Sequence, residues 1–179
     1  MKPIFIGNTK HLIDWDKIIS DIENKPGDKL PRWNWDHPEF LKIKHLYETS
    51  GYLPESAEWI NYYAETGDYD EEVNKLFGEF VGKTKFARVW ISRINPGRTA
   101  PWHWDIDDLS NEFESAGSLI RYTARINKDG TGQVALVDDY AIIGGEQGDV
   151  YQWTDTKLWH GSANVGYTVK YQFNCLAFV

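Results

Sequence analysis

The sequence predicts an α+β protein with a helical first half and a mainly β second half. Apolar residues in the first half recur at helix spacing, whereas the second half holds short runs of β-branched and aromatic residues separated by turns. Strands and helices do not alternate in the second half, which favours a sandwich or barrel. The length of 179 residues fits a single domain, with residues 1–82 as a helical layer and residues 83–179 as the β core.

Four helices are predicted in the helical layer. In the first, Trp15, Ile18 and Ile22 recur at the spacing of one helix face. The second can begin at Pro38, because proline is tolerated in a first helical turn, and Gly82 can end the fourth. The four predicted ranges are Asp14–Ile22, Pro38–Tyr47, Ser56–Tyr63 and Asp70–Val81.

At least six strands are predicted after Lys83. The first ends at a Pro-Gly turn pair, and the second ends at a Lys-Asp-Gly sequence typical of a hairpin. The predicted strands are Phe86–Asn95, Leu119–Asn127, Val134–Val137, Ala141–Ile143, Val150–Trp153 and Thr168–Val179.

Two of these strands divide into an apolar face and a polar face. Side chains alternate along a strand, so Arg121 and Arg125 share one face of the strand from Leu119. Lys170 likewise shares one face of the last strand with Gln172 and Asn174. These polar faces can lie in water, which the strands alone favour. Alternatively the helices cover the apolar faces, and the basic faces line a polar cavity between two sheets.

Composition excludes several classes of function. A net charge of −8 argues against binding of duplex nucleic acid, which needs a basic surface. No apolar run approaches the length of a membrane span, so no membrane association is expected. The single cysteine, Cys175, excludes an internal disulfide and fits a reducing compartment, so we expect a cytoplasmic protein with a buried thiol in an apolar strand.

A candidate metal site comes from His103, Asp105 and His160. His103 and Asp105 project from the same face if residues 103–105 are extended, and His160 follows 55 residues after the aspartate. Two imidazoles and one carboxylate can bind Fe(II) on one face and leave three positions open. These three possible metal ligands favour the alternative in which the basic strand faces line a polar cavity between two sheets. Trp102 and Trp104 flank the ligands and can form an aromatic wall for a substrate.

With Lys170 ten residues after His160, this pattern resembles the Fe(II)/2-oxoglutarate-dependent oxygenases. Residues 148–160 resemble the segment before the second histidine of that superfamily's aspartyl/asparaginyl β-hydroxylase-like members, and residues 119–125 resemble their arginine-bearing strand. A prolyl-hydroxylase-like branch is the other candidate. The resemblance covers about residues 85–179 and implies a double-stranded β-helix, or jelly-roll, core.

The resemblance also implies roles for these residues. His103, Asp105 and His160 would hold Fe(II), and Lys170 would bind the distal carboxylate of the co-substrate 2-oxoglutarate. Arg121 and Arg125 would face that co-substrate. The protein is then expected to be a dioxygenase, most simply a hydroxylase, acting on a peptide side chain or a small molecule.

Two other functions stay open at this stage. One is a cupin-like metal enzyme of another class, which has no need of a cation at Lys170. The other is a non-catalytic jelly-roll module that binds sugar or peptide, which has no need of three metal ligands.

Overall fold

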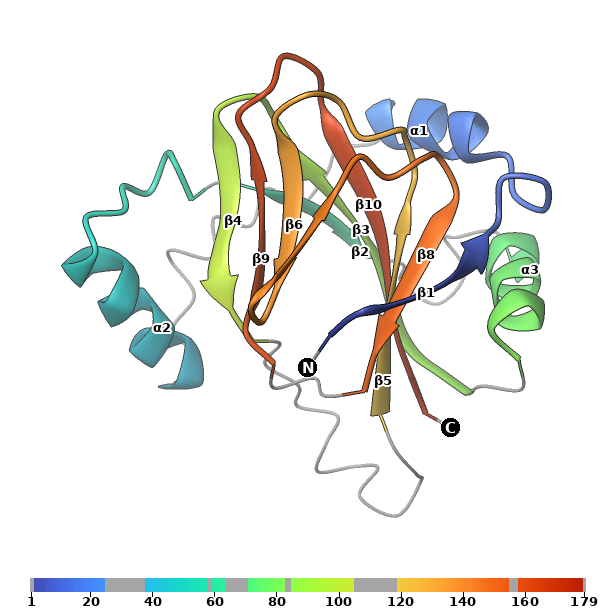
Figure 1. Ribbon diagram of the computed structural model, residues 1–179, viewed down its shortest axis with the longest axis horizontal. Helices are drawn as coiled ribbons and strands as arrows, with labels where there is room; N and C mark the ends of the chain where they lie inside the picture. Colours follow the sequence, from blue (N-terminus) through green and yellow to red (C-terminus); the bar gives the residue numbers. More distant parts are fainter. Residues whose placement is uncertain are drawn as a thin grey trace.

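In the computed structural model, the described residues form mainly two antiparallel β-sheets, with three helices (Figure 1). It describes residues 2–24, 38–57, 59–63, 71–82, 85–104, 119–154 and 158–178. The larger sheet has the order β1-β8-β5-β10-β3-β2, and the smaller sheet has the order β4-β9-β6-β7. The mainly β class predicted from the sequence is confirmed.

The strand bounds are as follows. The larger sheet contains β1 (Ile4–Asn8), β2 (Ile60–Tyr63), β3 (Lys85–Ile94), β5 (Leu119–Arg125), β8 (Asp149–Trp153) and β10 (Lys170–Phe178). The smaller sheet contains β4 (Arg98–His103), β6 (Gln133–Val137), β7 (Tyr140–Ile143) and β9 (His160–Asn164).

Two of the three helices cover the outer face of the larger sheet. Helix α1 (Trp15–Glu23) begins at Asp14, whose side chain accepts a hydrogen bond from the backbone N–H of Lys17 (3.0 Å). Helix α1 and helix α3 (Glu71–Val81) pack their apolar faces against β3, β5 and β10. Helix α2 (Pro38–Thr49) lies at the other end of the molecule, beside β4 (Figure 1). All three confirm predicted helices within a few residues.

The helix predicted over Ser56–Tyr63 is wrong. Its C-terminal half is strand β2, which pairs with β3 through Asn61 opposite Ser92. The Ser92 hydroxyl donates a hydrogen bond to Asn61 Oδ1 (2.7 Å), and both residues are buried. A stretch of four residues fits the residue spacing of a helix and that of a strand equally well, so the sequence pattern does not decide between them. Without β2 this edge of β3 would be unpaired, and pairing with it makes these residues a strand. The first 82 residues are therefore not helical throughout.

Strands β1, β4 and β9 were not predicted either. Strand β1 lies at an edge of the larger sheet and is interrupted by a bulge between Phe5 and Gly7. Strand β4 contains Pro101, which is accommodated at an edge and beside a register shift. Strand β9 is short and rich in small polar residues, which have a low intrinsic preference for strands. It is a strand because it pairs with β4 on one side and β6 on the other.

The divided faces of β5 and β10 are resolved in favour of the polar cavity. Phe173 and Cys175 on β10 lie in the core beneath α1 and α3, as does Tyr122 on β5. The opposite faces are also buried, because they point toward the smaller sheet. The buried polar side chains of these two strands are Arg121, Thr123, Arg125, Lys170, Gln172 and Asn174.

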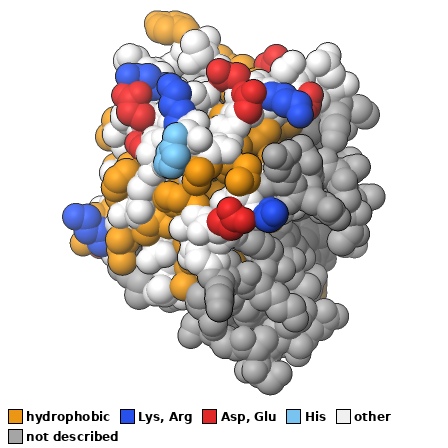
Figure 2. Space-filling view, turned by 90° about the vertical axis from the view of Figure 1, so that its right-hand side faces the viewer, with side chains coloured by type: hydrophobic (Ala, Val, Ile, Leu, Met, Phe, Trp, Pro, Cys, Tyr) orange, Lys and Arg blue, Asp and Glu red, His pale blue; other side chains and the backbone are white. Residues whose placement is uncertain are grey.

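One face of the molecule carries both charged and apolar side chains (Figure 2). The face at the right of Figure 1 carries charged side chains along its upper part and apolar side chains below them (Figure 2). None of the helices in the described segments is long and apolar enough to cross a membrane.

Phe173 is the central aromatic contact between the larger sheet and its helices. Its ring lies 4.8 Å from that of Phe77 on α3 and 5.5 Å from that of Trp15 on α1. We expect Phe173→Ala to lower the free energy of unfolding by about 3–5 kcal/mol, because it leaves a cavity. Chemical denaturation measures this loss. The control is Ile143→Ala at a position 73% exposed, which should change stability by less than about 0.5 kcal/mol.

Candidate active site

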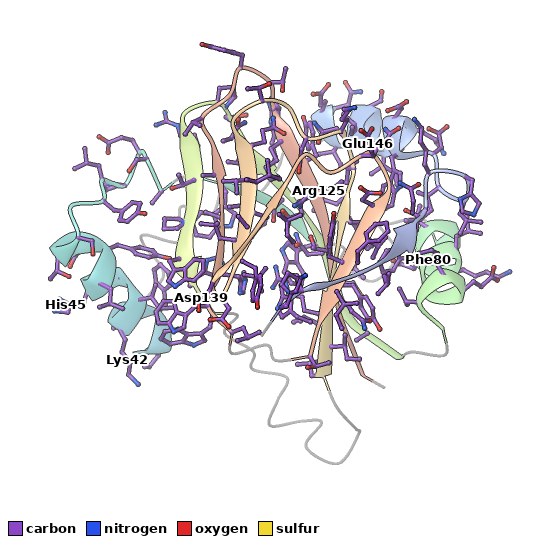
Figure 3. All side chains as sticks on the ribbon, viewed as in Figure 1. Lys42, His45, Phe80, Arg125, Asp139 and Glu146 are labelled. Atoms are coloured by element: carbon purple, nitrogen blue, oxygen red, sulfur yellow. The ribbon has the colours of Figure 1, made fainter. Side chains whose placement is uncertain are left out.

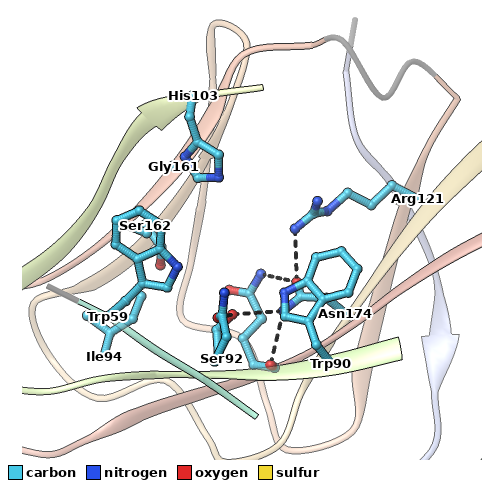
Figure 4. Close-up of a pocket in the computed structure, with 12 residues that line it drawn as sticks. Trp59, Trp90, Ser92, Ile94, His103, Arg121, Gly161, Ser162 and Asn174 are labelled. Atoms are coloured by element: carbon cyan, nitrogen blue, oxygen red, sulfur yellow. Dashed lines mark hydrogen bonds between the residues drawn. The ribbon is translucent and has the colours of Figure 1, made fainter. Parts of the chain in front are cut away.

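A cavity between the two sheets brings together side chains from both halves of the sequence. From the larger sheet come Arg121, Gln172 and Asn174, and from the smaller sheet come His103 and Ser162 (Figure 4). The remaining lining residues are Trp59, Asn61, Trp90, Ser92, Ile94, Ala100 and Gly161. The free volume of this cavity is about 30 Å³, which is enough to hold water.

The two predicted histidine ligands meet at one end of the smaller sheet. His103 at the end of β4 is paired in register with His160 at the start of β9, and their ring centroids are 4.5 Å apart. Both side chains are buried, at 6% and 5% exposure. Gly161 permits this close approach, because a Cβ there would lie 2.9 Å from the backbone oxygen of Ala100.

Both imidazoles are oriented by the same backbone interaction. His103 Nδ1 lies 2.6 Å from the carbonyl oxygen of Pro101, and His160 Nδ1 lies 2.9 Å from that of Leu158. A carbonyl oxygen can only accept, so each Nδ1 carries a proton and donates it. The lone pair of each neutral ring is therefore on Nε2. Histidines that ligate metals are commonly oriented in this way.

The third predicted ligand, Asp105, lies outside the described residues. Within the segments that are described, no group of three His, Cys, Asp or Glu side chains lies close enough to hold a metal ion. The two histidines fit the imidazole part of the predicted Fe(II) site by tautomer, burial and proximity. The carboxylate ligand, Asp105, is predicted from the sequence alone.

Aromatic side chains surround the histidine pair. The Trp59 ring stacks on His103 at 5.7 Å, and Trp153 lies 5.9 Å from His160. Trp104 contacts Trp159 edge to face at 4.6 Å and packs on the apolar cluster of helix α2. Trp104 therefore connects α2 to this end of the sheet. Trp102 is half-buried on β4.

Arg121 lies in the same cavity as His103. Its guanidinium is 4.9 Å from the Trp90 ring and 5.3 Å from the Trp153 ring. Arg121 Nη2 donates a hydrogen bond to Asn174 Oδ1 (3.2 Å; Figure 4). A cation placed between two aromatic faces is held in a defined position.

Lys170 and Arg125 are not among the residues that line this cavity, and both form ion pairs with Asp129. Lys170 Nζ is 2.9 Å from Asp129 Oδ1, and Arg125 Nε is 3.0 Å from Asp129 Oδ2. All three side chains are buried, and Arg125 lies between the two sheets (Figure 3). Burial and the nearby Arg125 lower the pKa of Lys170 to about 8, although Asp129 opposes this shift.

A hydrogen-bonded chain connects this ion-pair cluster to the cavity. Arg125 Nη1 donates to Gln172 Oε1 (3.1 Å), and Gln172 Nε2 donates to Asn174 Oδ1 (3.0 Å), which also accepts from Arg121. We call this chain the inner polar ladder; its residues are Arg121, Asn174, Gln172, Arg125, Asp129 and Lys170. Asp129 was not predicted as a site residue, because it lies in a Lys-Asp-Gly segment that is typical of a turn.

Comparison with solved structures shows which fold this is. The structure is similar to a viral collagen prolyl hydroxylase from Paramecium Bursaria Chlorella virus-1, solved with 2-oxoglutarate (TM-score 0.50). The match has 18% sequence identity and covers 88% of this chain and 98% of the viral chain. This chain has a double-stranded β-helix fold. The jelly-roll core expected from the sequence is therefore confirmed, whereas the branch of the oxygenases named in the sequence analysis is not.

A second structure supports the same fold. An oxidoreductase of the 2OG-Fe(II) oxygenase family from Burkholderia pseudomallei matches with a TM-score of 0.52 and 11% sequence identity. The match covers 91% of this chain and 77% of that protein.

Sequence comparisons are less informative. No protein-family profile matches the chain. A stretch of 41 residues is 34% identical to polyphenol oxidase E of Solanum lycopersicum and to catechol oxidase B of Solanum tuberosum. The match spans 23% of this chain and only 7% of either plant protein, so it does not assign a family.

The lowered pKa of Lys170 predicts a pH dependence of stability. In the unfolded chain Lys170 keeps its proton to about pH 10.5, whereas in the folded protein it loses the proton near pH 8. Between these values the unfolded state binds more protons, so this group makes stability rise with pH. Denaturation of the wild type and Lys170→Met at pH 7.5 and 9.5 measures this. The free energy of unfolding of the wild type, relative to that of Lys170→Met, should be larger at pH 9.5 than at pH 7.5. The same difference at both pH values would show that the pKa of Lys170 is not lowered.

Proposed function

We propose that this protein is an Fe(II)- and 2-oxoglutarate-dependent dioxygenase that hydroxylates a C–H bond. The observation that supports this most directly is the buried His103–His160 pair, with both Nδ1 atoms donating to backbone carbonyls. The ladder cations behind the pair supply the positive charge that a keto diacid requires. The double-stranded β-helix fold is consistent with this activity.

His103 and His160 would hold the metal through Nε2, with Asp105 as the carboxylate ligand. Iron, when bound, supplies the activation of dioxygen with 2-oxoglutarate as the reductant. The chain itself contributes orientation, because the hydrogen bonds to Pro101 and Leu158 fix both rings. The aromatic rings around them exclude water from the reacting groups.

The substrate is proposed to be a peptide side chain or a small molecule. Trp102 and Trp104 lie beside the histidine pair along the chain and can contact a substrate there. Duplex nucleic acid remains an unfavourable partner because the chain carries a net charge of −8. We propose a cytoplasmic location, in keeping with the reduced, buried Cys175.

The test is anaerobic titration with Fe(II) and 2-oxoglutarate, followed by visible absorption. Chelation of the keto acid to iron gives a weak charge-transfer band, which we expect in the wild type. His160→Ala removes one imidazole ligand and should abolish the band. Loss of an outer-shell partner of a metal ligand already lowers metal affinity by about 10–100-fold, so loss of the imidazole itself should lower direct iron binding by at least tenfold.

The matched control is His45→Ala, because His45 is an exposed histidine on helix α2, far from the site (Figure 3). This variant should retain the band. Iron binding without the band in the wild type would contradict the proposal and favour a cupin-like metal enzyme. A folded wild-type protein that binds no iron would also contradict the proposal and would favour a non-catalytic binding module.

A further inference from the structure

We infer that the indole N–H of Trp153 donates a hydrogen bond to the metal-bound carboxylate of the co-substrate and so orients it beside His160. This inference rests on the proposed function and deepens it, because it adds a ligand contact that does not involve the metal itself. Trp153 is the last residue of β8, and its ring packs against Ala135 and Val137 of the smaller sheet.

The indole nitrogen of Trp153 is a buried donor without an acceptor. The side chain is 2% exposed, and Nε1 has no hydrogen-bond partner among the described residues. The buried members of the apolar cluster around the ring are Ala135, Val137 and Ile142, whose side chains cannot accept a hydrogen bond. Because a buried polar group normally has a partner, this N–H is available to an acceptor on a ligand.

A second buried tryptophan shows the usual arrangement. Trp15 is 1% exposed, and its Nε1 donates to Thr9 Oγ1 at 3.1 Å. Its ring lies beside Phe173, in the core between α1 and the larger sheet. The indole N–H of Trp15 is therefore satisfied by the protein, on the face of the larger sheet that is turned away from the cavity.

The position of Trp153 places its ring at the histidine end of the cavity. The ring lies 5.9 Å from that of His160, at an interplanar angle of 53°. The guanidinium of Arg121, which lines the cavity, lies 5.3 Å from the same ring, and the two residues are in register across β5 and β8. A ligand bound to a metal at His160 would therefore have the indole and a cationic side chain as neighbours.

A carboxylate is the acceptor that fits this position best. A 2-oxo acid chelates a metal through its keto oxygen and the adjacent carboxylate, and that carboxylate keeps lone pairs that can accept a hydrogen bond. The positive charge of Arg121 beside the ring favours a negatively charged acceptor. The distal carboxylate keeps the partner predicted from the sequence, Lys170, so the two ends of the co-substrate would have different protein partners.

The experiment follows the indole N–H resonances of isotope-labelled protein in heteronuclear NMR spectra. Zn(II) takes the place of Fe(II), because it has no redox chemistry and avoids turnover. Trp153→Phe keeps an aromatic ring and removes the N–H, so the resonance missing from its spectrum identifies Trp153. When 2-oxoglutarate is added to the wild-type protein with Zn(II), this resonance should move downfield, since the N–H gains a charged acceptor.

The affinity for 2-oxoglutarate is a second readout, measured by calorimetry with Zn(II). Trp153→Phe should weaken binding about threefold to tenfold, because it removes one hydrogen bond. The matched control is Trp15→Phe, which removes an indole N–H that is already bonded to Thr9. This control should melt at a lower temperature than the wild type and bind 2-oxoglutarate with unchanged affinity. Thermal melting confirms that each variant is folded.

The outcomes separate this inference from the proposed function. A Trp153 resonance that stays in place when 2-oxoglutarate binds would overturn the inference alone. A shift that is complete with Zn(II) before 2-oxoglutarate is added would also overturn it, because the acceptor would then be water. Wild-type protein that binds no 2-oxoglutarate with either Zn(II) or Fe(II) would overturn both. If Trp153→Phe does not fold, Trp153→Tyr fills more of the space and serves for the same assignment and comparison.

Discussion

The structure depends on the burial of both faces of its six-stranded sheet. One face can be apolar, because α1 and α3 cover it, but the other carries charged side chains that are equally removed from water. A buried charge is costly unless it is paired and hydrogen-bonded. The inner polar ladder satisfies this requirement by pairing two cations with one carboxylate and connecting them to amide side chains.

The smaller sheet meets a different requirement, which is to bring two histidines together without flexibility. Adjacent antiparallel strands place His103 opposite His160, and the same i−2 carbonyl contact fixes both rings. A site built on paired strands holds its ligands more precisely than one on loops, because the ladder hydrogen bonds set the spacing. The close packing at Gly161 is part of the same arrangement.

These two constructions meet in one small cavity. His103 comes from the smaller sheet and Arg121 from the larger, so the packing of the two sheets sets the distance between the histidine end and the cationic end of the cavity. Asp129 pairs with Lys170 and Arg125, and neither of these cations is among the residues that line the cavity. Internal ion pairing therefore separates these two cations from the cavity, although they lie on the same strands as its lining residues.

The sequence by itself determined the strand-rich second half, helices α1, α2 and α3, and the division of β5 and β10 into two faces, because those patterns depend on local periodicity. It also indicated His103 and His160 as a pair through their order. Only the tertiary structure decided that residues 60–63 form a strand, since an unpaired β3 edge outweighs a four-residue pattern. It also decided that Lys170 pairs with Asp129, 41 residues away, because side-chain pairing between distant strands leaves no periodic trace in a sequence.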